Sequence, residues 1–501
     1  MAWSDQEQQR LQKLERIQEH GIDPYPARCV RTHTARQAVA AFEAAANGVD
    51  EPPDVVVSVT GRLHSFRDMG KSIFAHIEDG SGTLQVYVRK NMLEQEVDFD
   101  LFKRQSDLGD FYRFTGPLFR TRTGEVTVKA TSLSLLSKAI SPLPVVKEKD
   151  GQRFSAFADV EARYRQRYAD LAVNPDVRRI FVARARVIQA LRRFLDDRDF
   201  LEVETPVLQP VYGGAAARPF VTHHNQLHQD LYLRISFELY LKRLLVGMYE
   251  RVYEIGRDFR NEGVSYKHNP EFTQLEFYAA YLDYNDVMDL TEQMVAFVAE
   301  QVVGDTEIDY QGQKIDLTPP WRRATLRELA LDVTGIDYVQ YPTAQSLYEA
   351  IRAKGLPAKE GATWGYLVDK SLLGAVEPTL IQPTFVYDYP RDISPLAKAK
   401  PDDPAHVERF EFFIGGLECG NAFSELNNPL DQEQRFLEMG RLYDDQDEES
   451  HPMDEDYLRA MRYGMPPCGG FGAGVDRLVM LFTDQNSIRE VLLFPHLRTR
   501  D

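Results

Sequence analysis

Residues 251–278 read RVYEIGRDFRNEGVSYKHNPEFTQLEFY, and residues 469–481 read GGFGAGVDRLVML. The first stretch predicts a strand, a loop that carries FRNEG, and a second strand with polar residues at alternate positions. The second predicts a glycine-rich strand that runs into a helix opening at Asp476 and Arg477. Neither stretch contains the GxxxxGK(S/T) pattern of a Walker loop. Together they offer arginines for phosphates, an aromatic ring for adenine and glycines for close backbone approach, which indicates a site that uses ATP to activate a substrate.

The composition is that of a globular protein of 501 residues with a formal net charge of −18. This length predicts two or three domains. No apolar run reaches about eighteen residues and the N-terminus lacks the apolar core of a signal peptide, so we expect no membrane span and a cytoplasmic protein. The cysteines, Cys29, Cys419 and Cys468, are too few and scattered for a disulfide framework or a zinc site. The negative charge argues against a DNA partner but leaves room for RNA on a local basic face.

Residues 55–143 predict a small β-barrel. Alternating or β-branched runs suggest five strands, with one helical interruption at residues 91–105. This pattern fits a closed barrel of the OB type, which binds single-stranded nucleic acid on one face. The basic side chains of this region agree with an RNA partner: Arg62, Arg67, Lys71, Arg89, Lys90, Arg120, Arg122 and Lys129.

Two further segments flank the predicted barrel. Residues 1–54 predict a helical extension, whose helix at residues 3–20 either packs on the protein or contacts RNA through Lys13 and Arg16. Residues 144–160 are proline-rich and then polar, which predicts a linker.

Residues 161–501 predict the largest domain, in which strands and helices mix. Between residues 200 and 300 the links between strands are too short for crossovers, so antiparallel pairing is favoured there. Residues 320–375 look helical and predict a helical insertion between the strand-rich parts.

The arginines of the two opening stretches are candidates for phosphate binding. An arginine in a strand is most often a surface residue, but Arg260 stands in FRNEG and Arg477 follows a glycine-rich strand at the start of a helix. Guanidinium groups match phosphate oxygens in a bidentate way. Phe272 could stack on adenine, and His268 could contact a terminal phosphate or be an ordinary histidine.

Two groups of glutamates suggest further sites. Glu411 and Glu418 flank Gly415 and Gly416, whose turn would bring both carboxylates to one place, either for Mg²⁺ or as exposed turn residues.

Glu238, Glu276 and Glu425 lie in apolar-rich segments, where a buried carboxylate needs a cation. That cation is either a nearby basic side chain or the ammonium group of a substrate, which Tyr278 could also contact.

These segments resemble the class II aminoacyl-tRNA synthetases. Residues 251–278 and 469–481 are similar to motifs 2 and 3 of that family, and FLEVETPVL around Pro206 is similar to motif 1, which builds the family's dimer interface. Five shorter segments resemble the bacterial lysyl-tRNA synthetases: GGAAARPFVTHHNQL, ELYLKRL, FRNEG, HNPEFT and GNAFSELN.

The resemblance covers nearly the whole chain and implies an α+β protein: an OB-type barrel, then an antiparallel catalytic sheet flanked by helices, with a helical insertion. It implies that ATP activates L-lysine to lysyl-adenylate and that the lysyl group then passes to tRNA(Lys). Mg²⁺ is the implied cofactor and a homodimer the implied assembly. Because the lysine carboxylate itself attacks the α-phosphate, catalysis should rest on positioning and charge stabilisation.

The resemblance also implies residue roles. Arg260 would bind the α-phosphate and the substrate carboxylate, and Arg477 the γ-phosphate and one face of adenine, whose other face would lie on Phe272. The remaining ATP contacts would be Glu262, His268 and Asn269, and the Mg²⁺ ligands Glu411 and Glu418. The lysine pocket would comprise Glu238, Glu276, Tyr278, Asn421, Phe423 and Glu425, and the anticodon contacts Arg67, Phe74, Gln85 and Glu125.

The chain departs from the family pattern at a few positions. Ser236 and Phe237 replace the usual Ala-Pro before ELYLK, Leu417 replaces an arginine, and Cys419 and Ala422 are also unusual. Ser236 leaves β-lysine and ornithine open beside lysine. Other hypotheses are a lysyl or β-lysyl transferase that acts on a protein, a non-catalytic RNA-binding regulator, and an aspartate- or asparagine-specific relative, whose pocket would want a cation.

Overall fold

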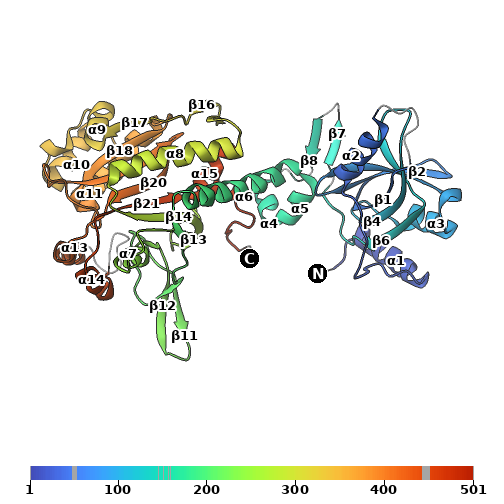
Figure 1. Ribbon diagram of the computed structural model, residues 1–501, viewed down its shortest axis with the longest axis horizontal. Coiled ribbons are helices and arrows are strands. Elements are labelled where there is room, and N and C mark those ends of the chain that lie inside the picture. Colours follow the sequence, from blue (N-terminus) through green and yellow to red (C-terminus); the bar gives the residue numbers. More distant parts are fainter. Residues whose placement is uncertain are drawn as a thin grey trace. The chain divides into compact units, whose positions relative to one another are not determined.

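The structure is a computed structural model that describes residues 2–47, 54–144, 146–149, 152–155, 157, 159–442 and 452–499. It contains two compact units, Met1–Ala158 and Asp159–Asp501 (Figure 1). No helix of the described residues is long and apolar enough to cross a membrane.

The first unit is built on one six-stranded sheet. Its strands are β1 (Val56–Asp68), β2 (Ser72–Asp79), β3 (Gly82–Arg89), β4 (Phe111–Arg120), β5 (Val126–Lys129) and β6 (Ser132–Ser137). The order β1-β2-β3-β5-β4 returns to β1, because β1 also pairs with β4. Helix α3 (Glu96–Gln105) falls in the predicted interruption. The prediction of five strands is wrong, because the last run forms two: β5 pairs with β3 and β4, whereas β6 pairs only with β4.

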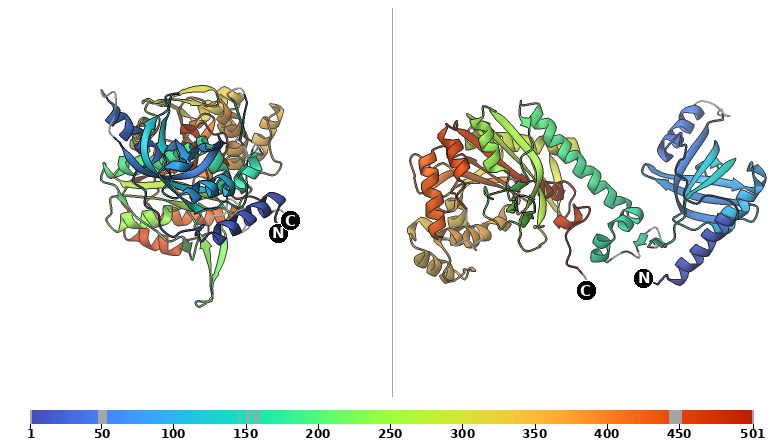
Figure 2. Two further views of the ribbon diagram at one scale, coloured as in Figure 1. Left: turned by 90° about the vertical axis from the view of Figure 1, so that its right-hand side faces the viewer. Right: turned by 90° about the horizontal axis from the view of Figure 1, so that it is seen from below.

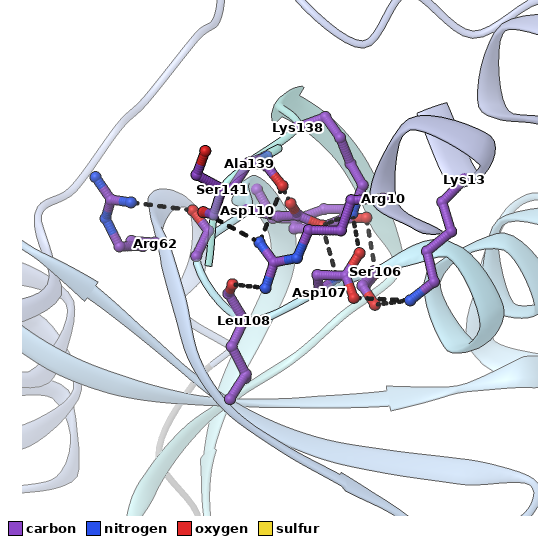
Figure 3. A network of polar contacts seen from close by, with 12 residues as sticks. Arg10, Lys13, Arg62, Ser106, Asp107, Leu108, Asp110, Lys138, Ala139 and Ser141 are labelled. Carbon is purple, nitrogen blue, oxygen red and sulfur yellow. Dashed lines mark hydrogen bonds and ion pairs between the residues drawn. The ribbon is translucent and has the colours of Figure 1, made fainter. Parts of the chain in front are cut away.

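Two N-terminal helices pack on this barrel, α1 (Asp5–Glu19) and α2 (Ala35–Ala46). A polar network fixes α1 (Figure 3): Arg10 donates to backbone carbonyls, and the Lys13 ammonium lies 2.7 Å from the Asp107 carboxylate. The Lys138 side chain has no exposed surface and pairs with Asp107 at 2.6 Å and with Asp110 at 2.8 Å. Of the two roles considered for Lys13, the structure therefore shows packing.

The predicted linker, residues 144–160, is more ordered than its composition suggests. In the part of it that the structure describes, β7 (Val146–Lys149) and β8 (Gln152–Ser155) form an antiparallel hairpin. Helices α4 (Val160–Arg165) and α5 (Arg167–Val173) follow.

The second unit centres on an eight-stranded sheet with the order β17-β18-β19-β20-β21-β14-β13-β9. Its six central strands are β13 (Arg251–Phe259), β14 (Glu271–Ala280), β18 (Thr384–Pro390), β19 (His406–Ile414), β20 (Leu417–Ser424) and β21 (Cys468–Gly474). They pair antiparallel, as predicted. The edge strands β9 (Leu201–Glu202) and β17 (Arg322–Thr325) pair parallel to their neighbours. Long connections make this possible: helices lead from β17 to β18, and three short strands and a helix lead from β9 to β13.

Helices α6 (Pro175–Asp196), α8 (Tyr284–Val302) and α15 (Val475–Phe482) cover one face of this sheet (Figure 1 and Figure 2). The core on this face includes Phe277, Phe412 and Phe471, whose rings stack. Since side chains alternate along a strand, the residues directly before and after each of these phenylalanines point to the opposite face of the sheet. Helices α7 (Glu238–Val246), α13 (Pro429–Leu442) and α14 (Glu455–Arg462) belong to a second core beside that face.

The predicted helical insertion, residues 320–375, is not separate from the sheet. It begins with strand β17, and its helices bury apolar side chains against Val386, Val407 and Phe413 of the sheet. The segment contains α9 (Leu326–Thr334), α10 (Ala344–Ala353), α11 (Trp364–Tyr366), a π-helical stretch at Leu367–Leu373 and α12 (Gly374–Val376). The smaller strands of the unit are β10 (Leu208–Gln209), β11 (Val221–His224), β12 (Gln229–Leu233), β15 (Glu307–Tyr310) and β16 (Gln313–Asp316).

Candidate active site

Rows of paired residues across the sheet place the polar side chains on one face. Along one row, Glu411 pairs with Asn421, Asn421 with Gly472, and Gly472 with Glu276. The next row on the same face, two residues along each strand, contains Arg409, Phe423, Gly470 and Tyr278. The strand register thus brings residues from four separate segments side by side on one continuous surface.

Glycines in β21 make room on this surface. A Cβ atom at Gly470 would lie 1.9 Å from the Glu425 carboxylate oxygen Oε1 and 2.5 Å from the Tyr278 ring. Only glycine therefore lets Glu425 and Tyr278 approach β21.

Two adjoining pockets open on this face. The larger, with a volume of about 740 Å³, is lined by all eight residues predicted to bind ATP and metal: Arg260, Glu262, His268, Asn269, Phe272, Glu411, Glu418 and Arg477. The smaller, of about 200 Å³, is lined by all six predicted for the amino acid: Glu238, Glu276, Tyr278, Asn421, Phe423 and Glu425. Arg260 lines both pockets. What each residue binds stays a prediction, but the fold gathers each predicted set in one place.

Arg260 and Phe272 face each other where the β13–β14 hairpin opens into its loop. The guanidinium carbon of Arg260 lies 5.0 Å from the centroid of the Phe272 ring, which is cation–π distance. Its Nε donates to the Ile235 carbonyl at 3.4 Å. The ring thus holds the guanidinium at the junction of the two pockets.

Arg477 stands in the first turn of α15 and reaches His268 of the loop. Its Nη2 lies 3.5 Å from the His268 Nε2. Burial, together with Arg477 and Lys267, lowers the pKa of His268 to about 4. The imidazole is therefore neutral at pH 7 and can act only as a hydrogen-bonding group.

Glu411 and Glu418 come together through the turn at Gly415 and Gly416, whose φ angles are 63° and 73°. Burial and the nearby Glu418 raise the pKa of Glu411 to about 7. Burial acts the same way on Glu418, but Arg477 and other cations outweigh it and lower the pKa of Glu418. Glu411 is buried and Glu418 is partly exposed, and both line the larger pocket.

This pair fits a hard divalent cation. Among the described residues no cluster of three or more His, Cys, Asp or Glu side chains could hold a metal ion. Mg²⁺ nevertheless suits such a pair, because it commonly binds one or two carboxylates and takes its other ligands from water and phosphates.

Behind the smaller pocket lies a residue that the sequence analysis missed, Lys242, which pairs with two of the acids of that pocket. Its ammonium group lies 2.5 Å from the Glu238 carboxylate and is also ion-paired with Glu425, and no part of its side chain is exposed. The i, i+4 spacing of Glu238 and Lys242 on α7 was a signal for the first pair. Of the two cations considered for the buried acids, the basic side chain is present, but it is one cation for three acids. The ammonium group of a substrate therefore stays a prediction for the others.

Glu276 is held by hydrogen bonds from neutral groups. It accepts from Ser236 Oγ at 2.7 Å, from Gln274 Nε2 at 2.9 Å and from the Tyr278 hydroxyl at 3.3 Å. Burial, together with neighbouring carboxylates, raises the pKa of Glu276 well above its usual value. The unusual Ser236 thus acts on a pocket glutamate, whereas the unusual Leu417 is buried in the core and lines neither pocket.

Comparison with known proteins places this geometry in a family. Residues 159–498 match the class II tRNA synthetases of the D, K and N type, and residues 57–136 match the OB-fold nucleic acid binding domain. The chain belongs to the class II tRNA synthetases. It is 52% identical to a lysine–tRNA ligase of Roseiflexus castenholzii over 100% of both chains, and 47% identical to one of Bacillus subtilis over 99% of this chain and 98% of that protein.

The synthetase is thus an enzyme. Its OB-fold carries three of the predicted anticodon residues, Arg67, Phe74 and Gln85, on the neighbouring strands β1, β2 and β3. The fourth, Glu125, lies directly before β5. The Phe74 ring centroid lies 4.7 Å from that of Tyr87, and Arg67 pairs with Phe74 in the β1–β2 register. Gln85 Nε2 donates to Glu125 at 2.7 Å. The sequence analysis did not name Tyr87, which lies two residues from Gln85 on β3 and pairs with Phe74 of β2. Residues two apart on a strand point to the same face, so Tyr87 lies on the face that carries Gln85 and Phe74.

Proposed function

We propose that the chain is a lysine–tRNA ligase. It activates L-lysine with ATP to give lysyl-adenylate and pyrophosphate, and then transfers the lysyl group to the 3′ end of tRNA(Lys). The observation that carries the choice of amino acid is the charge of the smaller pocket. The acids Glu238, Glu276 and Glu425 are all buried. Among the described residues Lys242 is ion-paired with Glu238 and Glu425, whereas Glu276 has neutral hydrogen-bond partners.

The remaining charge matches lysine. Two acids can therefore lose a proton and pair with a positively charged ligand: the described residues give Glu276 no ion pair, and Glu425 shares Lys242 with Glu238. The other nearby cation, Arg409, is paired with Glu411 at 2.7 Å. Lysine brings two ammonium groups, and its carboxylate can face Arg260 at the junction of the pockets. Aspartate and asparagine carry one ammonium group and would leave a buried carboxylate unpaired, which costs several kcal/mol.

The first step needs no protein nucleophile. An oxygen of the lysine carboxylate attacks the α-phosphorus of ATP, and the bond from that phosphorus to the pyrophosphate oxygen breaks. Arg260 orients the carboxylate against the α-phosphate, and Phe272 and Arg477 hold the adenine between them. Glu411 and Glu418 would hold Mg²⁺, which neutralises charge on the phosphates when bound.

The loop residues support the nucleotide by fixing the backbone. Asn269 donates to the Glu271 carbonyl at 2.7 Å, and the Ser265 hydroxyl lies 2.8 Å from His268 Nδ1. His268 then presents a neutral side chain to the ATP-binding pocket, and Glu262 presents a negative one.

The second step uses the barrel as a recognition unit for the tRNA anticodon through Phe74, Gln85, Arg67 and Glu125. Complete barrel and catalytic units on one chain favour a tRNA acceptor over a protein acceptor. A cytoplasmic homodimer, assembled through the segment around Pro206, is part of the proposal, and exposed apolar residues such as Leu201 and Leu208 near that segment support it.

Amino-acid-dependent ATP–pyrophosphate exchange tests the proposal. The purified protein is assayed with lysine, β-lysine, ornithine, aspartate and asparagine, and then with tRNA(Lys). Exchange with lysine and charging of tRNA(Lys) are expected. Exchange with aspartate or asparagine in place of lysine would refute the charge argument, and exchange with lysine without tRNA charging would favour a protein acceptor.

A further inference from the structure

We propose that Lys242 is a positioning residue for amino-acid selection: it holds Glu238 and Glu425 toward the pocket and sets the number of cations that the pocket accepts. The inference rests on the proposed activation of lysine. Lys242 belongs to α7, one turn after Glu238, whereas Glu425 follows β20.

The contacts show a bridge between two segments that are far apart in the sequence. The Lys242 ammonium lies 2.5 Å from Glu238 Oε1 and is ion-paired with Glu425 Oε2. Burial disfavours the charged form of Lys242, but Glu238 and Glu425 outweigh burial and raise the pKa of Lys242 well above 10.5. The ammonium therefore stays charged and fixes one oxygen of each carboxylate.

Lys242 lies behind the two acids and not in the substrate's place. Glu238 and Glu425 line the smaller pocket, whereas Lys242 lines neither pocket. The described part of the chain offers no hydrogen-bond partner to Glu425 Oε1, and this buried oxygen is the one next to Gly470 of β21. Among the described residues, Glu425 thus uses one oxygen for Lys242 and leaves the other without a partner.

This arrangement determines how many positive charges fit. Without Lys242, no resident cation would offset the repulsion between Glu238 and Glu425, and the pKa of Glu425, already raised by burial, would rise further. A ligand ammonium group would then have to displace a proton that is held more tightly. With Lys242, one resident cation is present for three acids, which leaves room for the two ammonium groups of a diamine such as lysine.

The test uses ATP–pyrophosphate exchange with the full-length Lys242→Met variant, which keeps the side-chain length and removes the charge. The KM for lysine should rise about tenfold or more, because a buried ion pair is broken, while the KM for ATP should stay within about twofold. The double variant Lys242→Met/Glu425→Gln restores the net charge of the pocket. It should show a lower KM for lysine than Lys242→Met.

Lys138 provides a matched control. Its ammonium is equally buried and also bridges two carboxylates, Asp107 and Asp110, but in the barrel (Figure 3). Lys138→Met should lower the melting temperature and leave the KM for lysine unchanged in this assay.

Three outcomes separate the inference from its alternatives. Equal changes in both KM values for Lys242→Met, or a double variant no better than the single one, would overturn the role of Lys242. If Lys242→Met does not fold, the double variant decides alone. If its KM for lysine rises no more than its KM for ATP, the role of Lys242 is overturned. Wild-type protein without lysine-dependent exchange would instead refute the proposed function.

Discussion

Arg477 contacts Glu418 through both the backbone and the side chain of that residue. Its Nη1 donates to the Glu418 carbonyl at 2.5 Å and lies 3.4 Å from the Glu418 carboxylate. The contact joins the helix after β21 to the start of β20, so that the residues proposed to bind the nucleotide and the metal share one support. Loss of Arg477 should therefore disturb both.

Replacement of Arg477 by alanine should weaken ATP binding about tenfold or more, because a charged hydrogen-bond donor to phosphate is lost. Lysine binding should change less than about twofold. Calorimetric titration with each ligand measures the two affinities. Arg327→Ala, which removes an exposed ion pair with Asp337, is the control and should change neither. Unchanged ATP affinity in Arg477→Ala would contradict its assignment.

Glu238→Gln should weaken lysine binding by about 1.5–3 kcal/mol, the usual contribution of a charged hydrogen bond, and should spare ATP binding. The variant keeps the shape of the side chain but removes the charge that faces the pocket. Separate titrations with lysine and with ATP provide the measurement. Equal losses for both ligands would show that Glu238 supports the fold and not the amino acid.

Gly470→Ala should abolish lysine-dependent exchange, because the new methyl group would lie 1.9 Å from Glu425 and 2.5 Å from the Tyr278 ring. Gly80, in the turn between β2 and β3, is the control, since a Cβ atom there would meet no atom within 4 Å and Gly80 lines neither pocket. Exchange rates and melting temperatures of both variants should be compared. A fully active Gly470→Ala would exclude the close approach of Glu425 to β21.

Phe74→Ala should impair tRNA charging and leave lysyl-adenylate formation intact. Stacking of an aromatic ring on one base contributes about 1–3 kcal/mol, so the KM for tRNA should rise about fivefold to a hundredfold. Charging and ATP–pyrophosphate exchange are measured on the same preparation. A parallel loss of both activities would mean that the barrel is not a separate recognition unit.

Lysine binding should become tighter as the pH rises from about 6 to about 8. Burial raises the pKa of Glu425 from 4.5 to about 8, so the folded protein without lysine holds a proton that the unfolded chain has lost. The free energy of unfolding contributed by Glu425 therefore falls across this range, because only the unfolded state gains from losing the proton. A bound ammonium group favours the carboxylate and releases the proton.

Calorimetric titration with lysine at pH 7, in two buffers of different ionisation enthalpy, counts the protons released. Glu425→Gln should remove the release attributed to this residue. Identical proton counts for the wild type and the variant would assign the titration to another group. His268, with a pKa of about 4, should not contribute above pH 6.

Local sequence patterns were enough to predict much of this protein. The order of the glycine-rich and arginine-bearing segments indicated the family, and the family's fold followed. The turn at Gly415 and Gly416 correctly indicated two antiparallel strands with Glu411 and Glu418 together. The boundary between β5 and β6 was missed, because it depends on which neighbours each half pairs with and not on composition.

Local sequence patterns could not predict which charged side chains form ion pairs with one another. Alternation along a strand follows from backbone geometry, so the sequence alone indicated a strand with polar residues at alternate positions, the strand that carries Glu276 and Tyr278. The partner of Glu425 depends on how α7 packs beside the end of β20, and only the folded chain brings Lys242 there. Electrostatic energies depend on distance and burial in three dimensions, which is why the charge balance of the pocket required the tertiary structure.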